Sequence, residues 1–450
     1  MQHRAFGLIL SLAFLIVACS GPPIVVRKPE PRPLVRGIPA DSSTEWVERQ
    51  LAQPGSTLTL SRALQLALLA NPELKAFSLE IRAREARALQ ASLLPNPEVE
   101  VEVENVGGRG PTRGTRAAES TLFLSELIEL GGKRHKRSEA ARLEGELAAW
   151  DYEVRKLELF TRVVQTYVDV LAAQERVDLQ QMLLGLGGKF LETIRRRVEA
   201  GRTSPAEAYR ASVDLEFIQV ELEKARQELK SARKRLASLW GAKEPRFQRV
   251  EGNLEELKPV PPFSVLEDLL AENPEIARWA VERAYRTATL ELEKARRIPD
   301  PSVGLGYRRL NEEADQAFVL GLSVPLPLFD RNQGAIKEAQ VRRDQVEWFE
   351  KATRVALERQ LTESYNSLVA ASREVSVLKE RVLPNAREAY RVIRDGYKMG
   401  KFGYLEVLDA QRTLFEVRSR YLEALARYHK LVADLERLVG RDLLEIADKK

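Results

Sequence analysis

Cysteine and histidine are almost absent from this chain of 450 residues, which has one cysteine, Cys19, and three histidines, His3, His135 and His429. A single cysteine excludes a disulfide framework, and so few ligands exclude a zinc site of the Cys/His type. The sequence also lacks a glycine-rich phosphate loop followed by Lys-Ser/Thr, a nucleophile elbow and a histidine pair. We therefore expect no enzyme activity, no bound metal and no cofactor other than a covalent lipid.

An excess of charge of one sign is lacking as well. The 71 Lys and Arg residues almost cancel the 66 Asp and Glu residues, which leaves a net charge of +5 at pH 7. Because nucleic-acid-binding proteins need clustered basic patches, this balance argues against a nucleic acid partner. The charges are instead typical of solvated helix faces.

The apolar run Phe6–Val17 is too short for a mature transmembrane helix and predicts a signal peptide over residues 1–18. Its end, Ile16-Val17-Ala18-Cys19, resembles a bacterial lipobox, which implies lipidation of Cys19. An ordinary signal peptide with an incidental cysteine is the alternative. Ser20 after the cysteine, by resemblance to sorted lipoproteins, favours the outer membrane. Since one lipid chain anchors a protein only marginally, we expect a second membrane attachment.

Most of the remaining chain is an internal repeat with a period of about 200 residues. NPEL at Asn71–Leu74 returns as NPEI at Asn273–Ile276, and eight apolar heptad positions over 414–438 have eight apolar counterparts over 215–239. Alternating spacings of three and four mark a coiled-coil seam, which requires a helical partner. We predict a Pro-rich tether over 19–57, repeat 1 over 58–241, a linker over 242–262, repeat 2 over 263–440 and a C-terminal tail over 441–450.

Each repeat contains a stretch in which apolar residues alternate with a period of two. We expect β-hairpins at about 97–127 and about 301–325. In the first, Val99, Val101 and Val103 alternate with glutamates, so a strand there would face two environments and could cross a bilayer when tilted. A soluble hairpin packed on a helix is the alternative.

Long helices flank the hairpins and meet at glycine-containing turns. The stretch from Gly132 to about Glu199 predicts one long helix, followed by a tip turn at about 200–205 and a shorter helix. Repeat 2 has the matching turn at about 398–404. Both long helices have a weak point at matching positions, 184–188 and Pro384, which we interpret as a kink or bend rather than an end.

This plan, together with the lipobox, the NPE pairs and the turns GRTSPAEA and GKFGYLEVLDAQ, resembles the TolC-like outer-membrane efflux factors over about Leu58–Gly440. SELIELGGKR at Ser125–Arg134 resembles the CzcC-type members, which belong to heavy-metal exporters. The resemblance implies a mainly α fold with a small β part. Three protomers would form an α-helical periplasmic barrel and one shared twelve-stranded transmembrane β-barrel, with four strands from each. The residues agree, because four strands cannot close a barrel and open edges are excluded from lipid.

The function that this resemblance implies is a passive exit duct of a tripartite efflux pump. Its partners would be two other copies of the chain, a periplasmic adaptor (membrane fusion) protein, an inner-membrane RND pump and outer-membrane lipid. The protein would be lipid-anchored in the outer membrane of a diderm bacterium, with most of the chain in the periplasm, and would conduct heavy-metal cations. A TolC-like duct for drugs or type I protein secretion is one alternative, and a periplasmic coiled-coil scaffold lipoprotein is another.

The resemblance also assigns roles near the two tip turns. Glu406 and Asp409 match acidic rings that constrict the periplasmic aperture, although both could be ordinary surface charges. Tyr397 and Glu207 match a tyrosine–acid lock, and Arg210 could pair with an acid across the tip. Phe402 stands where the best-known members have an arginine of that lock. The residues implied to contact the adaptor are Gly201, Arg202, Thr203, Ser204, Gly400, Lys401, Phe402 and Gly403.

Overall fold

The computed structural model describes residues 28–29 and 57–447, so Cys19, the predicted signal peptide and most of the predicted tether lie outside the described residues. The chain divides into two compact units, each made from segments far apart in sequence. One unit contains Leu79–Trp150 and Arg278–Glu350; the other contains Asp151–Ala277 and Lys351–Lys450 together with the segment that ends at Ser78. Each unit therefore takes equivalent parts from both repeats.

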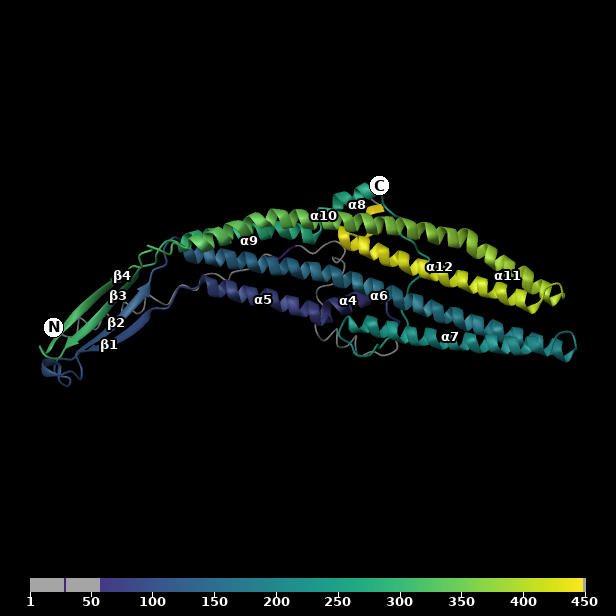
Figure 1. The fold of residues 1–450 in the computed structure, drawn as a ribbon, viewed down its shortest axis with the longest axis horizontal. Helices are drawn as coiled ribbons and strands as arrows, with labels where there is room; N and C mark the ends of the chain where they lie inside the picture. The colour runs from purple at the N-terminus through teal and green to yellow at the C-terminus, as the bar shows by residue number, and fades with distance from the viewer. Residues whose placement is uncertain (1–27, 30–56, 448–450) are drawn as a thin grey trace. The chain divides into compact units, whose positions relative to one another are not determined.

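The first unit contains an antiparallel sheet of four strands in the order β1-β2-β3-β4 (Figure 1). These are β1 (Glu98–Glu104), β2 (Glu119–Leu127), β3 (Ser302–Leu310) and β4 (Asp315–Ser323). The two hairpins of the two repeats join where β2 pairs with β3, with Leu124 opposite Leu305. Strands β1 and β4 are the two edges of this sheet, and every residue of β1 is exposed.

One aromatic ring and three glycines fit together on one face of the sheet. Phe123 of β2 lies over Gly304 and Gly306 of β3 and Gly321 of β4. A Cβ atom added at any of these glycines would lie within 2.4–2.6 Å of the Phe123 ring. The glycines in the strand pattern are therefore explained by close packing, which is a common reason for glycine inside a strand.

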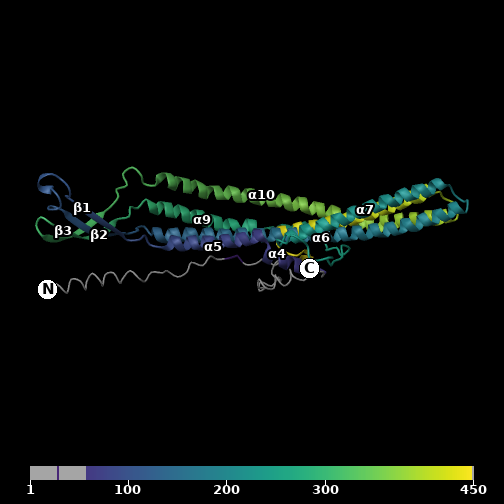
Figure 2. The ribbon, with the colours of Figure 1, turned by 90° about the horizontal axis from the view of Figure 1, so that it is seen from below.

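Four helices lead to and from this sheet: α5 (Pro72–Ser92), α6 (Lys133–Glu199), α9 (Pro274–Arg296) and α10 (Gln333–Val377). In the first unit, Arg84 of α5 pairs with Glu144 of α6, and Arg283 of α9 pairs with Glu350 of α10. Both views show α9 and α10 side by side (Figure 2).

The second unit is a helical bundle with the main hydrophobic core. Besides parts of the helices above it contains α4 (Leu60–Ala70), α7 (Pro205–Ser238), α8 (Phe263–Leu270), α11 (Leu383–Lys398), α12 (Tyr404–Val439) and α13 (Leu443–Ala447). Most heptad positions of α7 and α12, such as Leu236 and Leu435, are buried, and the others, such as Ile218 and Val417, are half-buried, which agrees with a coiled-coil seam.

The two NPE motifs perform the same structural task. The buried Asn71 accepts a hydrogen bond from the Leu74 amide and donates one to the Leu239 carbonyl at the end of α7. Its repeat counterpart Asn273 accepts from the Glu275 amide and donates to the Leu438 carbonyl of α12. Each asparagine thus satisfies free groups at the start of one helix and the end of another, which explains why the motif is repeated.

The helix interruptions differ in detail from those expected. Asn71 separates an 11-residue helix, α4, from α5. α6 runs unbroken as an α-helix through the glycines at 185–188, whereas the second long arm contains a π-helical turn, Leu378–Val382, directly before Leu383 and Pro384. The proline explains the turn, because it cannot donate the regular helical hydrogen bond. Over residues 57–447, no helix has both the length and the apolar character needed to cross a membrane.

Candidate functional site at the helical tips

The two tip turns lie in the second unit and have the same construction (Figure 1). Gly201 follows α6 with a φ of 65°, and Gly400 follows α11 with a φ of 76°. Such positive φ values are easily adopted only by glycine, so these residues reverse the chain after each long helix. Ser204 then caps α7, and Glu406 accepts a hydrogen bond from the Gly403 amide at the start of α12.

A small hydrophobic cluster, separate from the main core, supports the turns. We call it the tip cluster; it comprises Leu191, Ile194, Ala211, Tyr397, Tyr404 and Val407. The Phe190 ring packs on both tyrosines, with centroid distances of 5.3 Å to Tyr397 and 5.8 Å to Tyr404. The cluster therefore joins the α6–α7 hairpin to the α11–α12 hairpin within one protomer.

Two polar contacts fasten the same hairpins. Asp214 of α7 accepts hydrogen bonds from the Tyr404 hydroxyl at 2.8 Å and from Arg412 at 2.7 Å, both on α12. Burial raises the pKa of Tyr404, and the hydrogen bond to the Asp214 carboxylate raises it further, so the phenol remains a donor. Arg197 of α6 donates to the Tyr397 carbonyl at 2.9 Å and lies 4.5 Å from the centre of the Tyr397 ring.

Sequence reasoning missed Arg197, Asp214, Tyr404 and Arg412. The internal repeat provides no signal for them, because Asp214 aligns with Thr413 and Tyr404 aligns with Pro205. Asp214 and Tyr404 are 190 residues apart, and only the folded hairpins bring them together.

The Tyr397 hydroxyl and the Glu207 carboxylate, which the resemblance pairs as a lock, are neighbours, but no contact between them has regular hydrogen-bond geometry in the described part of the chain. The Tyr397 hydroxyl and Glu207 Oε2 are both buried, and neither has a hydrogen-bond partner there. Burial raises the pKa of Tyr397, Arg197 opposes this shift, and the neighbouring Glu207 carboxylate adds to it. The two groups are thus neighbours whose polar atoms are unsatisfied within one protomer.

Arg210 and Asp409 are exposed, and neither forms an ion pair within residues 57–447. The pair across the tip suggested for Arg210 therefore does not form inside one protomer. Glu406 is also exposed, but its carboxylate caps α12, so it has a structural task whatever else it does. Asp409 lies almost one turn further along the same helix.

The residues predicted to contact an adaptor surround the two turns. Thr203 is half-buried, and the other seven are exposed. Phe402 is 36% exposed and packs against α11, where a Cβ atom added to Gly396 would lie 2.4 Å from the Phe402 ring. Phe402 therefore anchors the second turn through packing, in the place where the best-known members have an arginine.

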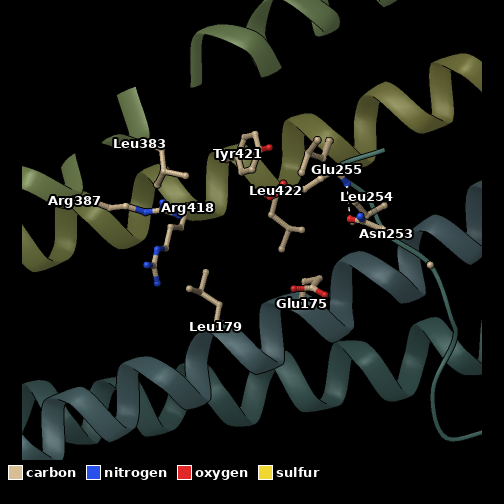
Figure 3. A pocket seen from close by; sticks show the side chains of 12 residues that line it. Glu175, Leu179, Asn253, Leu254, Glu255, Leu383, Arg387, Arg418, Tyr421 and Leu422 are labelled. Atoms are coloured by element: carbon tan, nitrogen blue, oxygen red, sulfur yellow. Dashed lines mark hydrogen bonds between the residues drawn. The ribbon is translucent and has the colours of Figure 1, made fainter. Parts of the chain in front are cut away.

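A cavity of about 350 Å³ lies further along the second unit, between α6, α12, the start of α11 and the linker at 252–255 (Figure 3). Arg387 and Arg418 lie at one side of it, and Glu175 and Glu255 also line it. Burial, followed by repulsion from Arg387, lowers the pKa of Arg418. Because its lining combines both charges, the cavity indicates no single ligand class. Within the described residues no group of His, Cys, Asp and Glu could hold a metal ion.

Comparison with known proteins agrees with this geometry. The family model described as outer membrane efflux protein matches residues 63–242 and 265–441, the two repeats. The cobalt-zinc-cadmium resistance protein CzcC of Cupriavidus metallidurans is 35% identical over 402 residues, which cover 89% of this chain and 94% of that protein. The nickel and cobalt resistance protein CnrC of the same organism is 29% identical over 62% of this chain and 66% of its own length.

Solved structures share the fold. A structure of CusC has a TM-score of 0.71 at 18% identity and covers 92% of this chain and 98% of its own. The open state of the MtrE outer membrane channel of Neisseria gonorrhoeae has a TM-score of 0.72 at 18% identity and covers 93% of this chain and 98% of its own. The fold and its two repeats thus define an outer-membrane efflux channel protein. This chain belongs to the outer membrane efflux protein family and is similar to CzcC over most of its length.

Proposed function

We propose that this protein is the outer-membrane exit duct of a tripartite pump that expels heavy-metal cations. The observation that carries the choice of substrate is the 35% identity to the cobalt-zinc-cadmium resistance protein, which extends over 89% of this chain. The toluene efflux pump outer membrane protein TtgF of Pseudomonas putida, a relative with an organic compound in its name, is 24% identical over 68% of this chain. The metal ion is cargo here, so the duct needs no binding cluster of its own.

The sheet supports assembly as a homotrimer. β1 and β4 are edge strands with unpaired backbone groups on their outer sides. Such groups cannot face lipid, and three copies of four strands would close a barrel in which β1 of one protomer pairs with β4 of the next. The same closure would place Val99 and Val101 toward lipid and the β1 glutamates toward the water-filled interior.

The tip turns are the proposed periplasmic mouth. Glu406 and Asp409 are both exposed and lie one turn apart on α12. Three copies of each would form rings of like charge that attract cations. The unsatisfied Tyr397 hydroxyl and Glu207 carboxylate are the proposed lock, and the exposed turn residues are the proposed contact for the adaptor of an inner-membrane RND pump. The anchor would be completed by lipid on Cys19.

Metal tolerance tests the proposed substrate. Deleting the gene should lower the tolerated concentration of at least one of zinc, cobalt, cadmium, copper and nickel, and a plasmid copy should restore it. Tolerance to toluene and to lipophilic drugs should stay unchanged, which provides the matched control. Unchanged tolerance to all five metals, with a loss of drug tolerance, would favour the duct for organic compounds instead.

Conductance tests the channel itself against a scaffold lipoprotein. The purified protein should migrate as a heat-resistant trimer and conduct ions in planar bilayers. A monomer that conducts nothing would reject the duct and favour the periplasmic scaffold.

A further inference from the structure

A group of exposed apolar side chains lies where the strands meet the helices of the first unit. We call it the junction collar; it comprises Ile128, Leu130, Ile298, Val324, Leu326, Leu328 and Phe329. Its most exposed members follow β4: Leu326 is 75% exposed, Leu328 65% and Phe329 90%. Monomeric soluble proteins rarely leave so many large apolar side chains together in water.

The collar continues the outer apolar face of the sheet. Along β4, Phe318, Leu320 and Leu322 pair in register with Tyr307, Leu305 and Val303, and this row of apolar side chains is exposed. The alternation does not stop where β4 ends at Ser323. Val324, Leu326 and Leu328 occupy the next three alternate positions, separated by Pro325 and Pro327.

The length of the apolar alternation indicates what covers it. From Phe318 to Leu322 the strand rises only about 13 Å. The chain turns after Leu326, because the Leu328 amide donates to the Leu326 carbonyl at 2.9 Å. From Phe318 to Leu326 an extended chain rises about 26 Å, or about 20 Å across a bilayer at a tilt of about 40°, and the apolar band of membrane barrels is about 25 Å high. The apolar part of the strand, at about 10 Å across the bilayer, is too short for that band, and the residues from Val324 to Leu326 extend the apolar alternation toward its full height.

Hydrogen bonds and an ion pair hold the backbone next to the junction collar. Lys133 at the start of α6 donates to the Ile298 carbonyl and pairs with Asp300 at 2.7 Å. Asn332 donates to the Glu293 carbonyl at 2.8 Å and so ties the start of α10 to the end of α9. Arg331 donates to the Pro327 carbonyl at 3.2 Å. These contacts hold the backbone at Ile298 and at the start of α10, and Arg331 ties the segment after β4 to that helix start.

Basic side chains lie beside the collar at the helix ends. Arg134, Arg297, Arg331 and Lys337 are all exposed, and none of them has a carboxylate partner among the residues described. Arginine and lysine next to an apolar belt are suited to the phosphates of lipid headgroups.

We propose that the junction collar lies in the phospholipid leaflet that faces the periplasm, with these four basic residues at its headgroup phosphates. The lipid contact thus extends beyond the strands onto the connection between β4 and α10. This inference rests on the proposed function, because it requires the sheet to be inserted in a membrane.

Tryptophan quenching by brominated lipid tests the position of the collar. The full-length trimer carrying Phe329→Trp would be reconstituted into phosphatidylethanolamine–phosphatidylglycerol vesicles with brominated acyl chains, and the wild-type signal subtracted. Leu320→Trp on the outer face of β4 is the positive control, and Met399→Trp, at a 65% exposed tip position, is the negative control. We expect the added fluorescence to be lost for Phe329→Trp and Leu320→Trp and kept for Met399→Trp. Quenching at Leu320→Trp alone would overturn the proposed lipid position of the junction collar but would leave the proposed channel function standing. Quenching at neither position would reject membrane insertion of the sheet itself.

The number of phospholipids that stay bound to the trimer tests whether the basic residues contact lipid headgroups. The variant Arg134→Gln, Arg297→Gln, Arg331→Gln should keep fewer phospholipids than wild type when the trimer is released from detergent in native mass spectrometry. The control variant Arg202→Gln, Lys398→Gln, Lys401→Gln removes the same charge from exposed residues of the other unit and should keep the wild-type number. Equal retention by both variants would overturn the headgroup contact.

Discussion

The Tyr404 hydroxyl donates a hydrogen bond of 2.8 Å to Asp214, and this contact joins the first residue of α12 to the third turn of the facing α7. The side chain of Asp214 is 17% exposed, whereas Arg412, its second partner, is 66% exposed. Because exposed ion pairs contribute little, the tyrosine contact should hold the two hairpins more strongly than the arginine contact.

Tyr404→Phe should therefore loosen the tip. It removes one hydroxyl and leaves the ring on Phe190, so the tip cluster keeps its packing. Hydrogen bonds to charged groups contribute about 1.5–3 kcal/mol, which corresponds to a roughly tenfold to hundredfold shift in an opening equilibrium. We expect higher conductance of the unliganded channel in planar bilayers. Arg412→Gln, the control, should change conductance little, and an equal effect of both substitutions would contradict this ranking.

The acidic residues of α12 should control cation entry. Glu406→Ala with Asp409→Ala should raise closed-state conductance and weaken block by divalent cations, because the rings of like charge would be lost. Since Glu406 at the third helical position also accepts a hydrogen bond from the Gly403 amide, its removal should cost about 0.5–1.5 kcal/mol of helix stability. Asp409→Asn, at an exposed position without an ion pair in the described chain, separates the two effects: it should weaken the block without loss of thermal stability. Unchanged block in both variants would reject the rings.

The features of the fold that occur in both repeats could be predicted from the sequence. The periodic apolar positions predicted the coiled-coil seams, and the alternation around Val101 and Leu320 lies in strands of the sheet. The family comparison confirmed the predicted membership and the mainly helical fold.

Contacts between distant segments were not predictable in the same way. Nothing near Asp214 in the sequence distinguishes it from the many carboxylates on helix faces, because its partner is 190 residues away. The capping role of Glu406 was visible in principle, since it follows the helix-starting Gly403 by three residues, but the resemblance drew attention to an aperture ring instead. Whether Glu406 and Asp409 also form that ring stays a prediction.

Acid should destabilise the helical unit through His429. Burial, followed by repulsion from Lys258, lowers its pKa, although the hydrogen bond to the Leu254 carbonyl at 2.8 Å opposes this. Because the pKa of His429 is lower in the folded chain than in the unfolded chain, the unfolded chain takes up the proton first as pH falls. The full stability is therefore present above about pH 6.5, the unfolded pKa, and is lost as pH falls toward the lower pKa of the folded chain. The loss is at most about 1.4 kcal/mol per pH unit for one group.

Nearby Glu436 acts in the opposite direction. Burial raises the pKa of Glu436, so the folded chain binds this proton more tightly than the unfolded chain does. The contribution of Glu436 to stability therefore grows as pH falls, and it is lost as pH rises through the pKa of the folded chain. A comparison with His429→Gln therefore isolates the histidine, since glutamine keeps a donor for Leu254 and leaves Glu436 in place. Melting temperature, followed by circular dichroism from pH 7.5 to 5, should fall less steeply in the variant; parallel curves would show that His429 does not titrate in this way.

Two glycines of the same chain should respond to alanine with opposite signs. At Gly306 of β3 the new Cβ would lie 2.6 Å from the Phe123 ring and 3.1 Å from the Leu122 carbonyl oxygen, so the ring must move. Overpacking of this kind costs about 1–3 kcal/mol. At Gly185, inside the unbroken α6, no neighbouring atom lies within 4 Å of the added Cβ, and alanine should stabilise the helix by about 0.5–1 kcal/mol. Thermal unfolding of the two variants beside wild type checks both signs. A stabilised Gly306→Ala would show that Phe123 is not fixed over the glycines, and a destabilised Gly185→Ala would show that α6 needs a flexible residue there, as its glycine-rich sequence first suggested.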